Sequence, residues 1–442
     1  MFLLCKYVSM TIPLDRLYHY IDNIAQEIYG DRVIIYRFFP HGSKNINDLN
    51  NIHSSDTWAD KNVFPLLWCH DQEPLNFEHY QQNIRTGSGT WIEILRSLNL
   101  SSKPKNLNYR KNIFEKNLLL HSEKRSQNIT KYYEANELIP VYYWSHAVIA
   151  LDWFRYANHV TQSAHSSKTF LIYNRAWSGT REYRLKFSEM LIRSDLQNLC
   201  RTSINPVEPE LNIHYELHKF NNPAWRPDCA LENFFPTSTA HSHYSADFDM
   251  EDYESTDIEV VLETLFDDSR LHLTEKSLRP VACGQPFILA ATQGSLEYLR
   301  SYGFKTFGHI WDERYDLIED PQERLIAIVD LMKQISNWTP TVREKKLSEA
   351  QMIADYNKQH FFSKDFFDLI INELKTNLTL AFDQLDQCNN YVKWVDTWTQ
   401  LFSFDKVKHF LQNSNDTKEP NQVGAEHSLR IAKEKLLRLT KL

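Results

Sequence analysis

Short apolar runs alternate along the chain with segments in which apolar residues recur every three or four positions. Runs such as "FPLLWCH" (64–70), "NLLLH" (117–121) and "KTFLIYN" (168–174) are bounded by polar residues, which is typical of buried strands in a parallel sheet. Segments 14–29 and 181–192 have the spacing of amphipathic helices. This alternation predicts an α/β fold with parallel sheets.

A second set of alternating elements lies in the middle of the chain. Segments "DIEVVLET" (257–264) and "QPFILAAT" (285–292) predict strands, and "TEKSLRPVACG" (274–284) predicts a short helix between them. From about residue 321 the pattern is mostly helical. We therefore expect two α/β domains and a helical C-terminal extension, covering residues 1–160, 161–340 and 341–442.

The composition is that of a globular protein with several reduced cysteines. Its 442 residues suit two domains, and the hydrophobic and charged shares of 42% and 24% are close to average. The six cysteines show no Cys-x-x-Cys spacing, which favours reduced thiols in the cytoplasm and no structural zinc. The N-terminal apolar run is too short for a signal peptide, and no run approaches the about 18 apolar residues of a membrane span.

The charges are unevenly distributed. The net charge of −8 argues against a broadly basic surface, yet the stretch from Lys103 to Lys131 holds eight Lys and Arg against two Glu. That stretch is either a solvated face or a contact for a polyanionic acceptor such as DNA. Residues 247–268 hold ten acids and no Lys or Arg. Their "DFD" triplet could bind a metal ion, but a solvated acidic loop explains it better, and we expect no metal site.

Several common catalytic motifs are absent from the sequence. It contains no Gly-x-Gly-x-x-Gly, no phosphate-loop Gly-Lys-Ser/Thr, no Gly-x-Ser-x-Gly and no His-Glu-x-x-His. These absences argue against the usual dehydrogenase, NTPase, serine hydrolase and zinc protease classes.

Polar clusters follow the predicted strands of the middle segment. In parallel α/β sheets, ligands bind at the carboxyl ends of strands, where helix N-termini hold anions. Two or three cations beside a helix start suit a diphosphate, and a carboxylate suits the hydroxyl groups of a ribose. The clusters predict a nucleotide-diphosphate site formed by Asn174, Arg175, Arg181, Glu263, Thr274, Glu275, Lys276 and Arg279.

The stretch "LETLFDDSRLHLTEKSLRPVACGQPFIL" (262–289) resembles the donor-binding signature of the alpha-1,3/4-fucosyltransferase family. In that family a Phe-Glu-Asn element precedes Thr-Glu-Lys, a helix and a Pro-led apolar strand. The resemblance implies two Rossmann-like domains in the GT-B arrangement, with the nucleotide sugar in the C-terminal one, and a phage or bacterial member of the family. It also implies that Glu275 holds the ribose hydroxyls and that Lys276 and Arg181 hold the diphosphate. The first element reads Leu-Glu-Thr here, so the donor sugar and base stay open.

The stretch "LLWCHDQEPLNFEHY" (66–80) resembles the family's element that carries the catalytic Glu. This resemblance makes Glu73 the expected base, and Asp71, His70 and His146 are the other candidates. Each has a structural alternative, because a carboxylate after a strand often caps a helix and a histidine among apolar residues is often a hydrogen-bonded core residue. A further predicted strand is "RVIIYRFF" (32–39), and the candidate acceptor contacts lie at its end: Arg37, His41 and Lys44.

Together these features predict a cytoplasmic glycosyltransferase that moves a hexosyl or pentosyl unit from a nucleotide-diphosphate sugar to an acceptor hydroxyl. The acceptor is a surface glycan or, in a phage protein, a modified DNA base. We expect inversion at the sugar and no cofactor or metal ion, because Lys and Arg supply the charge that stabilises the leaving diphosphate. The alternatives are a non-catalytic nucleotide-binding or scaffold protein of the same fold, and a carbohydrate-binding module that uses Trp177, Trp225 or Trp311.

Overall fold

A computed structural model describes two compact units of the chain. The first unit combines the described residues up to Asp152 with those from Phe367 onward, and the second unit is Trp153–Phe366. The predicted limits at residues 160 and 340 stay a prediction. The described residues are 21, 24, 25, 28, 34–37, 66–75, 117–136, 139–155, 157, 160, 166–209, 211–231, 248–266 and 270–385.

The sheet of the first unit adds its strands in sequence order. Strands β1 (Ile34–Arg37), β2 (Leu66–His70), β3 (Asn117–His121) and β4 (Ile139–Tyr142) lie in the order β1-β2-β3-β4, and all neighbours are parallel. The first three confirm predicted strands. Strand β4 was not predicted, because it contains Pro140, which a sheet tolerates on an edge strand such as this one.

Helices cover this sheet from both parts of the first unit. Helix α5 (Gln127–Asn136) joins β3 to β4, and α6 (Ser145–Trp153) follows β4 with nearly every residue buried. Helix α13 (Lys364–Leu385) comes from far along the chain, and its Asn377 side chain donates a hydrogen bond to the Tyr142 carbonyl. The predicted helix at 14–29 is confirmed at its described residues, which are helical and buried: Ile21, Ile24, Ala25 and Ile28.

The sheet of the second unit reverses its strand order. Strands β5 (Lys168–Asn174), β6 (Cys200–Ile204), β9 (Thr256–Leu262) and β10 (Phe287–Ala290) are parallel in the order β10-β9-β5-β6. The chain therefore moves outward from β5 in one direction and returns to add β9 and β10 in the other. The reversal between β5 and β9 is the topological switch point of this sheet.

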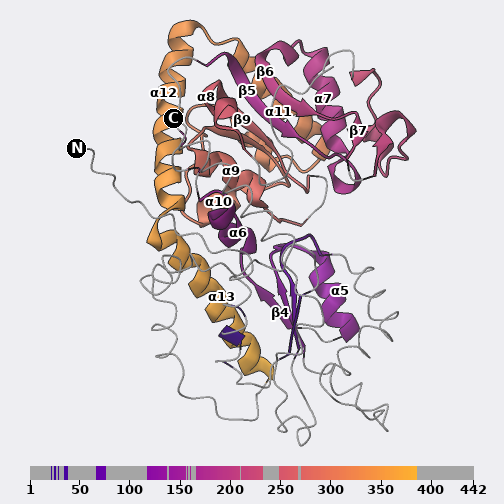
Figure 1. Ribbon diagram of the computed structural model, residues 1–442, viewed down its shortest axis with the longest axis vertical. Helices are drawn as coiled ribbons and strands as arrows, with labels where there is room; N and C mark the ends of the chain where they lie inside the picture. The colour runs from indigo at the N-terminus through magenta and orange to yellow at the C-terminus, as the bar shows by residue number, and fades with distance from the viewer. Residues whose placement is uncertain are drawn as a thin grey trace, which may run out of the picture. The chain divides into compact units, whose positions relative to one another are not determined.

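Two helices connect strands on opposite sides of that reversal. Helix α7 (Tyr183–Arg193) follows β5, after a 3-10 turn at Gly179–Arg181, and α9 (Glu275–Cys283) joins β9 to β10. Right-handed crossovers require helices on opposite faces of the sheet when the strand order reverses. Figure 1 shows α7 and α9 on either side of the strands. The predicted helix at 181–192 is thus confirmed, but it begins two residues later.

The remaining helices of the second unit pack on these. Helix α10 (Ser295–Ser301) follows β10, α11 (Pro321–Ser336) packs beside α7 and β10, and α12 (Pro340–Phe361) packs along α9. Gly284 ends α9 with a φ of 74°, and a Cβ atom there would approach the Lys358 side chain of α12 to 2.9 Å. Only glycine therefore allows this turn and the close contact together.

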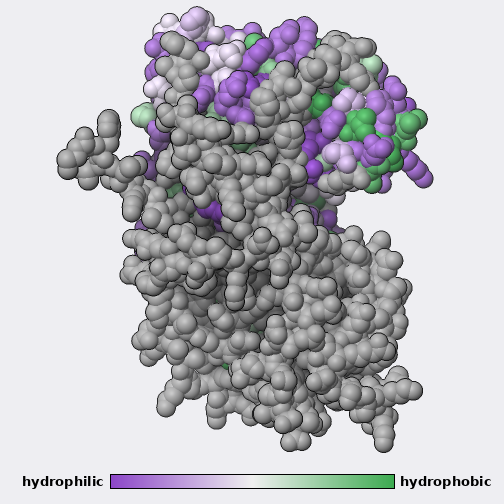
Figure 2. Space-filling model, in the orientation of Figure 1, coloured by the Kyte–Doolittle hydropathy of each residue, from purple (hydrophilic) through white to green (hydrophobic). Residues whose placement is uncertain are grey.

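Residues of the predicted extension 341–442 are helical as far as Leu385, in α12 and α13, and the rest lies outside the described residues. They do not form a unit of their own, because α12 belongs to the second unit and α13 from Phe367 onward to the first. Within the described part of the chain, no helix is long and apolar enough to cross a lipid bilayer. Apolar side chains gather on the surface over the short hairpin of β7 (Val207–Glu208) and β8 (Ile213–His214), as Figure 2 shows. Leu217, which is 82% exposed, belongs to this patch.

Candidate functional site

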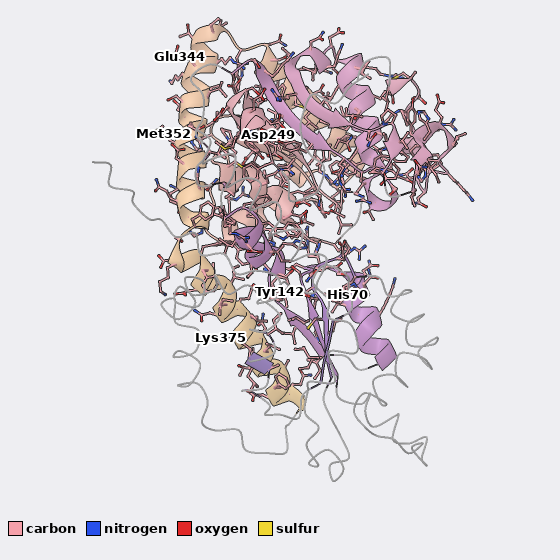
Figure 3. The ribbon with its side chains drawn as sticks, in the orientation of Figure 1. His70, Tyr142, Asp249, Glu344, Met352 and Lys375 are labelled. Atoms are coloured by element: carbon pink, nitrogen blue, oxygen red, sulfur yellow. The ribbon has the colours of Figure 1, made fainter. Side chains whose placement is uncertain are left out.

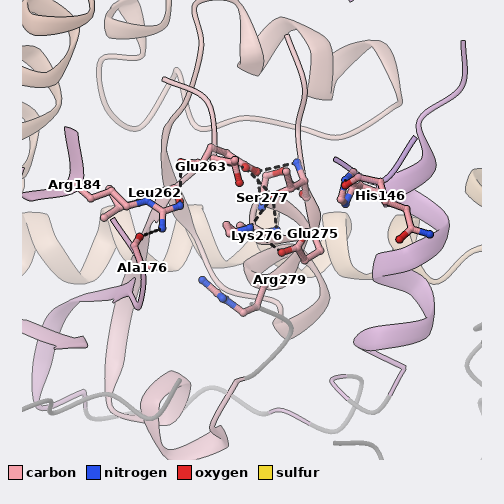
Figure 4. A network of polar contacts seen from close by, with 12 residues as sticks. His146, Ala176, Arg184, Leu262, Glu263, Glu275, Lys276, Ser277 and Arg279 are labelled. Carbon is pink, nitrogen blue, oxygen red and sulfur yellow. Dashed lines mark hydrogen bonds and ion pairs between the residues drawn. The ribbon is translucent and has the colours of Figure 1, made fainter. Parts of the chain in front are cut away.

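The carboxyl ends of β5 and β9 are joined by one buried arginine. Arg184 of α7 donates from Nη1 to the Ala176 carbonyl at 2.6 Å, and from Nη2 to the Leu262 and Glu263 carbonyls at 2.6 and 3.0 Å. Its burial lowers the pKa of this guanidinium. Figure 4 shows the arginine between the two strand ends. The strand ends at the switch point are therefore joined by a cation that is hydrogen-bonded to three carbonyl groups.

Glu263, which directly follows β9, holds the start of α9. Its fully buried carboxylate accepts hydrogen bonds from the Thr274 N–H (3.1 Å), the Thr274 hydroxyl (2.7 Å), the Ser277 N–H (3.1 Å) and the Thr264 N–H (3.0 Å). A carboxylate at this place satisfies amide groups that have no partner within the helix. The end of β9 and the first turn of α9 are thus fixed together by the protein itself.

The first two residues of α9 form an ion pair. The Lys276 ammonium lies 2.8 Å from a carboxylate oxygen of Glu275 and 3.4 Å from the Thr274 hydroxyl oxygen. The side chains of Lys276 and Glu275 are 15% and 5% exposed. Figure 4 shows this pair beside the network of Glu263 and Ser277. The structure therefore brings together four of the predicted donor residues: Glu263, Thr274, Glu275 and Lys276.

Arg279 lies one turn further along α9 and points into the interior. Its Nε and Nη2 atoms lie 3.2 and 2.5 Å from a carboxylate oxygen of Glu259, and its guanidinium stacks 4.3 Å above the Tyr173 ring. Burial alone would lower the pKa of Arg279, but the neighbouring Glu259 raises it well above its usual value. Tyr253 donates a further hydrogen bond to Glu259. Arg279 thus links α9 to β9 through Glu259 in the interior of the second unit.

The loop after β5 is held by side chains from further along the chain. Glu208 of β7 accepts hydrogen bonds from the Trp177 and Ser178 amides at 2.7 and 3.0 Å. Asn174 is buried and donates to the Arg184 carbonyl at 3.3 Å, while the Arg181 Nε donates to the Ser178 carbonyl at 3.2 Å. Arg175, the next residue after Asn174, is half-buried. The predicted residues of this loop therefore lie at the same carboxyl edge as Lys276.

In the first unit, the candidates after β2 lie at the carboxyl edge of its own sheet. Figure 3 marks this edge by His70, at the end of β2, and Tyr142, at the end of β4. Asp71 is buried, and its carboxylate accepts a hydrogen bond of 2.5 Å from the Tyr143 hydroxyl. The His146 Nε2 atom donates to the Gln72 carbonyl at 2.8 Å. Asp71 and His146 are therefore both bound to neighbouring loops.

The same loop is fixed again two residues beyond Glu73. The Leu75 amide donates to the Glu123 carboxylate at 2.6 Å, and the Leu75 carbonyl accepts from the Asn128 side chain at 3.1 Å. Burial lowers the pKa of His121, at the end of β3, to about 3, so this ring is neutral. Glu73 lies between these anchors and is half-buried, which leaves its side chain more accessible than that of Asp71.

The acceptor-side predictions lie mostly beyond the described part. Arg37 is the last residue of β1 and so lies at the same carboxyl edge as Asp71, whereas His41 and Lys44 lie outside the described residues. Of the basic stretch 103–131, only residues from 117 onward are described. Within them the Lys124 ammonium lies 4.7 Å from the centroid of the Tyr142 ring, and burial lowers its pKa.

Metal ligands are not grouped in the part of the chain that the structure describes. No cluster of three or more His, Cys, Asp or Glu side chains there could hold a metal ion. The Asp249 carboxylate of the "DFD" triplet instead accepts from the Glu251 amide at 2.9 Å and caps α8 (Met250–Glu254). This is the local role expected of an aspartate before a helix.

Comparison of the chain with protein-family models, curated proteins and solved structures finds no match in any of the three. The functional argument therefore depends on the site itself.

The sequence places Arg184 with Arg181 among the cations at the start of the helix after β5, as part of the predicted diphosphate site, and not as a link between strands. One signal for the structural role is present. Arg184, Ser188 and Leu191 recur at helical spacing and are all buried, so the arginine lies on the inward stripe of α7. An arginine on an inward stripe needs several acceptors, which points to a structural link between strands. Glu208 carried no comparable signal, because its partners are backbone amides of a distant loop.

Proposed function

We propose that this chain is a glycosyltransferase of the GT-B type, in which the second unit binds a nucleotide-diphosphate sugar and the first supplies the catalytic base. One observation supports the donor site above all. The first turn of α9, with Lys276 and Glu275, lies at the switch point between β5 and β9. In open parallel sheets this is where ligands bind, beside the carboxyl ends of the strands.

The donor would exchange partners with the ion pair of α9. Lys276 would leave Glu275 for the diphosphate, with further positive charge from Arg175 and Arg181, and Glu275 would then accept hydrogen bonds from the ribose hydroxyls. Amides at the helix start add to the attraction for an anion. The clamp of Glu263 on Thr274 and Ser277 keeps this turn in place while the partners change.

Transfer would proceed by direct displacement. Glu73 takes the proton of the acceptor hydroxyl as its oxygen attacks the anomeric carbon from the face opposite the diphosphate. The bond between the anomeric carbon and the diphosphate oxygen breaks, and the leaving group carries its electron pair away. Lys276 and Arg181 stabilise that charge. Asp71 and His146 would position the loop that carries Glu73. Asp71 accepts a hydrogen bond from Tyr143, and His146 donates one to the Gln72 carbonyl.

The first test is a thermal-shift panel of UDP, GDP, CDP, dTDP and CMP. We expect one diphosphate to stabilise the protein, by about 2.7 kcal/mol at 100 times its dissociation constant. Lys276→Ala should abolish this shift. The matched control is Lys333→Ala, since Lys333 is a lysine of α11 that pairs with Asp330 and is 44% exposed. No shift with any nucleotide would overturn the proposal.

The second test separates transfer from binding. Glu73→Gln keeps the shape of the side chain but removes its basicity, so it should retain the nucleotide shift and lose release of the nucleoside diphosphate from the donor sugar. Unchanged release would remove Glu73 from the mechanism. Nucleotide binding by the wild type without any release, with a range of sugars and acceptors, would favour the non-catalytic binding protein.

A further inference from the structure

A cavity of about 390 Å³ lies in the second unit, between the loop at 308–314, the last turns of α11 and the start of α12. Its volume falls at the small end of the range of ligand sites, about 300–1,000 Å³. The lining includes two indole rings, those of Trp311 and Trp338, and five polar side chains: His309, Asp312, Arg314, Gln334 and Lys346.

The two indole rings are held in place by packing. Trp311 is buried and stacks on Phe307 with 4.8 Å between ring centroids. Trp338 is half-buried, and the Lys346 ammonium lies 4.9 Å from the centroid of its ring while donating a hydrogen bond to the Ile310 carbonyl. The apolar part of the cavity is therefore preformed and needs little ordering when a ligand enters.

The polar part of the lining contains one ion pair, Asp312 with Arg314, and one further cation, Lys346. The Arg314 Nε atom lies 2.9 and 2.8 Å from the two carboxylate oxygens of Asp312. The hydrogen bonds from Arg314 lower the pKa of Asp312, so this group is a carboxylate. The pair and the exposed Gln334 amide present planar donors and acceptors without excess charge. A free anion is disfavoured because Arg314 is already neutralised by Asp312 and the Lys346 ammonium is engaged by the Ile310 carbonyl and the Trp338 ring. A purely apolar ligand would strip water from these groups without replacing its hydrogen bonds.

We propose that this cavity is a carbohydrate-binding subsite that takes a neutral sugar ring, alone or at the end of a short glycan. The C–H face of a pyranose packs on an indole ring, and its hydroxyls both donate to and accept from planar side chains such as those of Asp312, Arg314 and Gln334. A neutral, polyhydroxylated ring is the ligand that satisfies both parts of the lining.

The subsite is separate from the switch point. Near the start of α11, Arg324 donates to the Phe266 carbonyl, three residues beyond Glu263. Ile335 of the cavity lies eleven residues later on the same helix, which is about 16 Å along its axis. Sugar binding here therefore goes beyond the proposed transfer reaction and does not depend on a nucleotide at α9.

Saturation-transfer NMR on the full-length chain tests the subsite with maltose, cellobiose, lactose and N,N′-diacetylchitobiose. We expect signals from at least one of them, and a threefold to tenfold weaker dissociation constant in Trp338→Ala. Gln334→Ala removes an exposed side chain and should weaken binding without any risk to the fold. Met352→Ala is the matched control, because Met352 lies further along α12 (Figure 3) and is 65% exposed.

Three outcomes would overturn the subsite. The first is an absence of signal from all four disaccharides. The second is unchanged binding in both Trp338→Ala and Gln334→Ala. The third is loss of the signal on addition of a nucleoside diphosphate, which would place the sugar at the donor site instead. The nucleotide panel is independent of these results, so the two proposals fail separately.

Discussion

The two sheets of this protein present their carboxyl edges in different ways. The sheet β1-β2-β3-β4 adds strands in sequence order, and at its described edge the Asp71 and Glu123 carboxylates accept hydrogen bonds from the Tyr143 hydroxyl and the Leu75 amide. The sheet β10-β9-β5-β6 reverses direction, and its edge is joined by a buried arginine, Arg184, as well as by a carboxylate, Glu263. At the reversal a cation and an anion therefore join the loops of adjacent strands.

That difference supports the proposal that the second edge binds the donor. A buried charge is stable only when several hydrogen bonds replace its hydration. Arg184 has three carbonyl partners and Glu263 has four donors, so each fixes two or more segments at once. The first turn of α9 is therefore held rigidly before any ligand arrives.

The strongest test of the comparison is Arg184→Met. Loss of the guanidinium leaves three buried carbonyls with fewer partners, and we expect the free energy of unfolding in urea to fall by about 4 kcal/mol. Arg314→Met is the control, because the Arg314 side chain is 85% exposed, and it should leave the free energy of unfolding nearly unchanged. Equal losses of unfolding free energy in the two variants would show that the Arg184 guanidinium does not stabilise the link between β5 and β9.

The pH dependence of stability offers a second contrast. Asp316 accepts a hydrogen bond from the Leu296 amide near the end of β10, and burial raises its pKa from 3.8 to about 6. The folded state then binds the proton more tightly than the unfolded state. Protonated Asp316 therefore stabilises the folded state by about 3 kcal/mol below pH 4. This stabilisation is lost as the pH rises to about 6.

Asp316→Asn should remove this fall, as measured by urea unfolding at pH 4, 5, 6 and 7. Asp330→Asn, at an exposed position of α11, should run parallel to the wild type. A parallel profile for Asp316→Asn would mean that this carboxyl group does not titrate in that range.

A smaller effect is expected from Glu263→Gln. The amide keeps one acceptor oxygen but loses the charge at the start of α9, so we expect unfolding to become easier by about 2 kcal/mol. The nucleotide shift should weaken as well, because the turn that carries Lys276 is loosened. Glu297→Gln is the control, because Glu297 is an exposed residue in the first turn of α10. A nucleotide shift as large as that of the wild type in Glu263→Gln would show that the hydrogen bonds of Glu263 to Thr274 and Ser277 are not needed for nucleotide binding.

The smallest effect is expected at the carboxyl edge of the first unit's sheet. Tyr143→Phe removes the hydroxyl that donates to Asp71 and should lower stability by about 1 kcal/mol. Nucleotide binding should stay unchanged, since Tyr143 belongs to the first unit. Tyr356→Phe, at a partly exposed tyrosine of α12, is the control for both measurements. A weakened nucleotide shift in Tyr143→Phe alone would contradict the separation of the two edges.

The sequence predicted the elements whose patterns are local. Strand β5 was predicted to the residue, because "KTFLIYN" is an apolar run between polar segments, and the short helix predicted within 274–284 is α9. Strand β6, "CRTSI", was missed, since its few apolar residues form no run. Its place in the sheet comes from pairing with β5, which no local pattern encodes.

In the candidate site, too, the sequence identified the residue types but not their tertiary partners. Lys276 and Arg279 are two cations three residues apart on one helix, and sequence reasoning gave both to the donor. The structure separates them, because Glu259, which pairs with Arg279, lies on β9, twenty residues earlier in the chain. Which cation stays at the surface therefore depends on a tertiary partner.

The arrangement of the first unit sets an order for synthesis. Residues 153–366 make up the second unit without interruption, whereas the first unit also includes α13, whose Glu373 and Asn377 side chains bond to the segment after β4. A ribosome thus releases every residue of the second unit before α13 is complete. A chain that stops after residue 366 would retain the whole second unit but leave the strands of the first unit without the cover of α13.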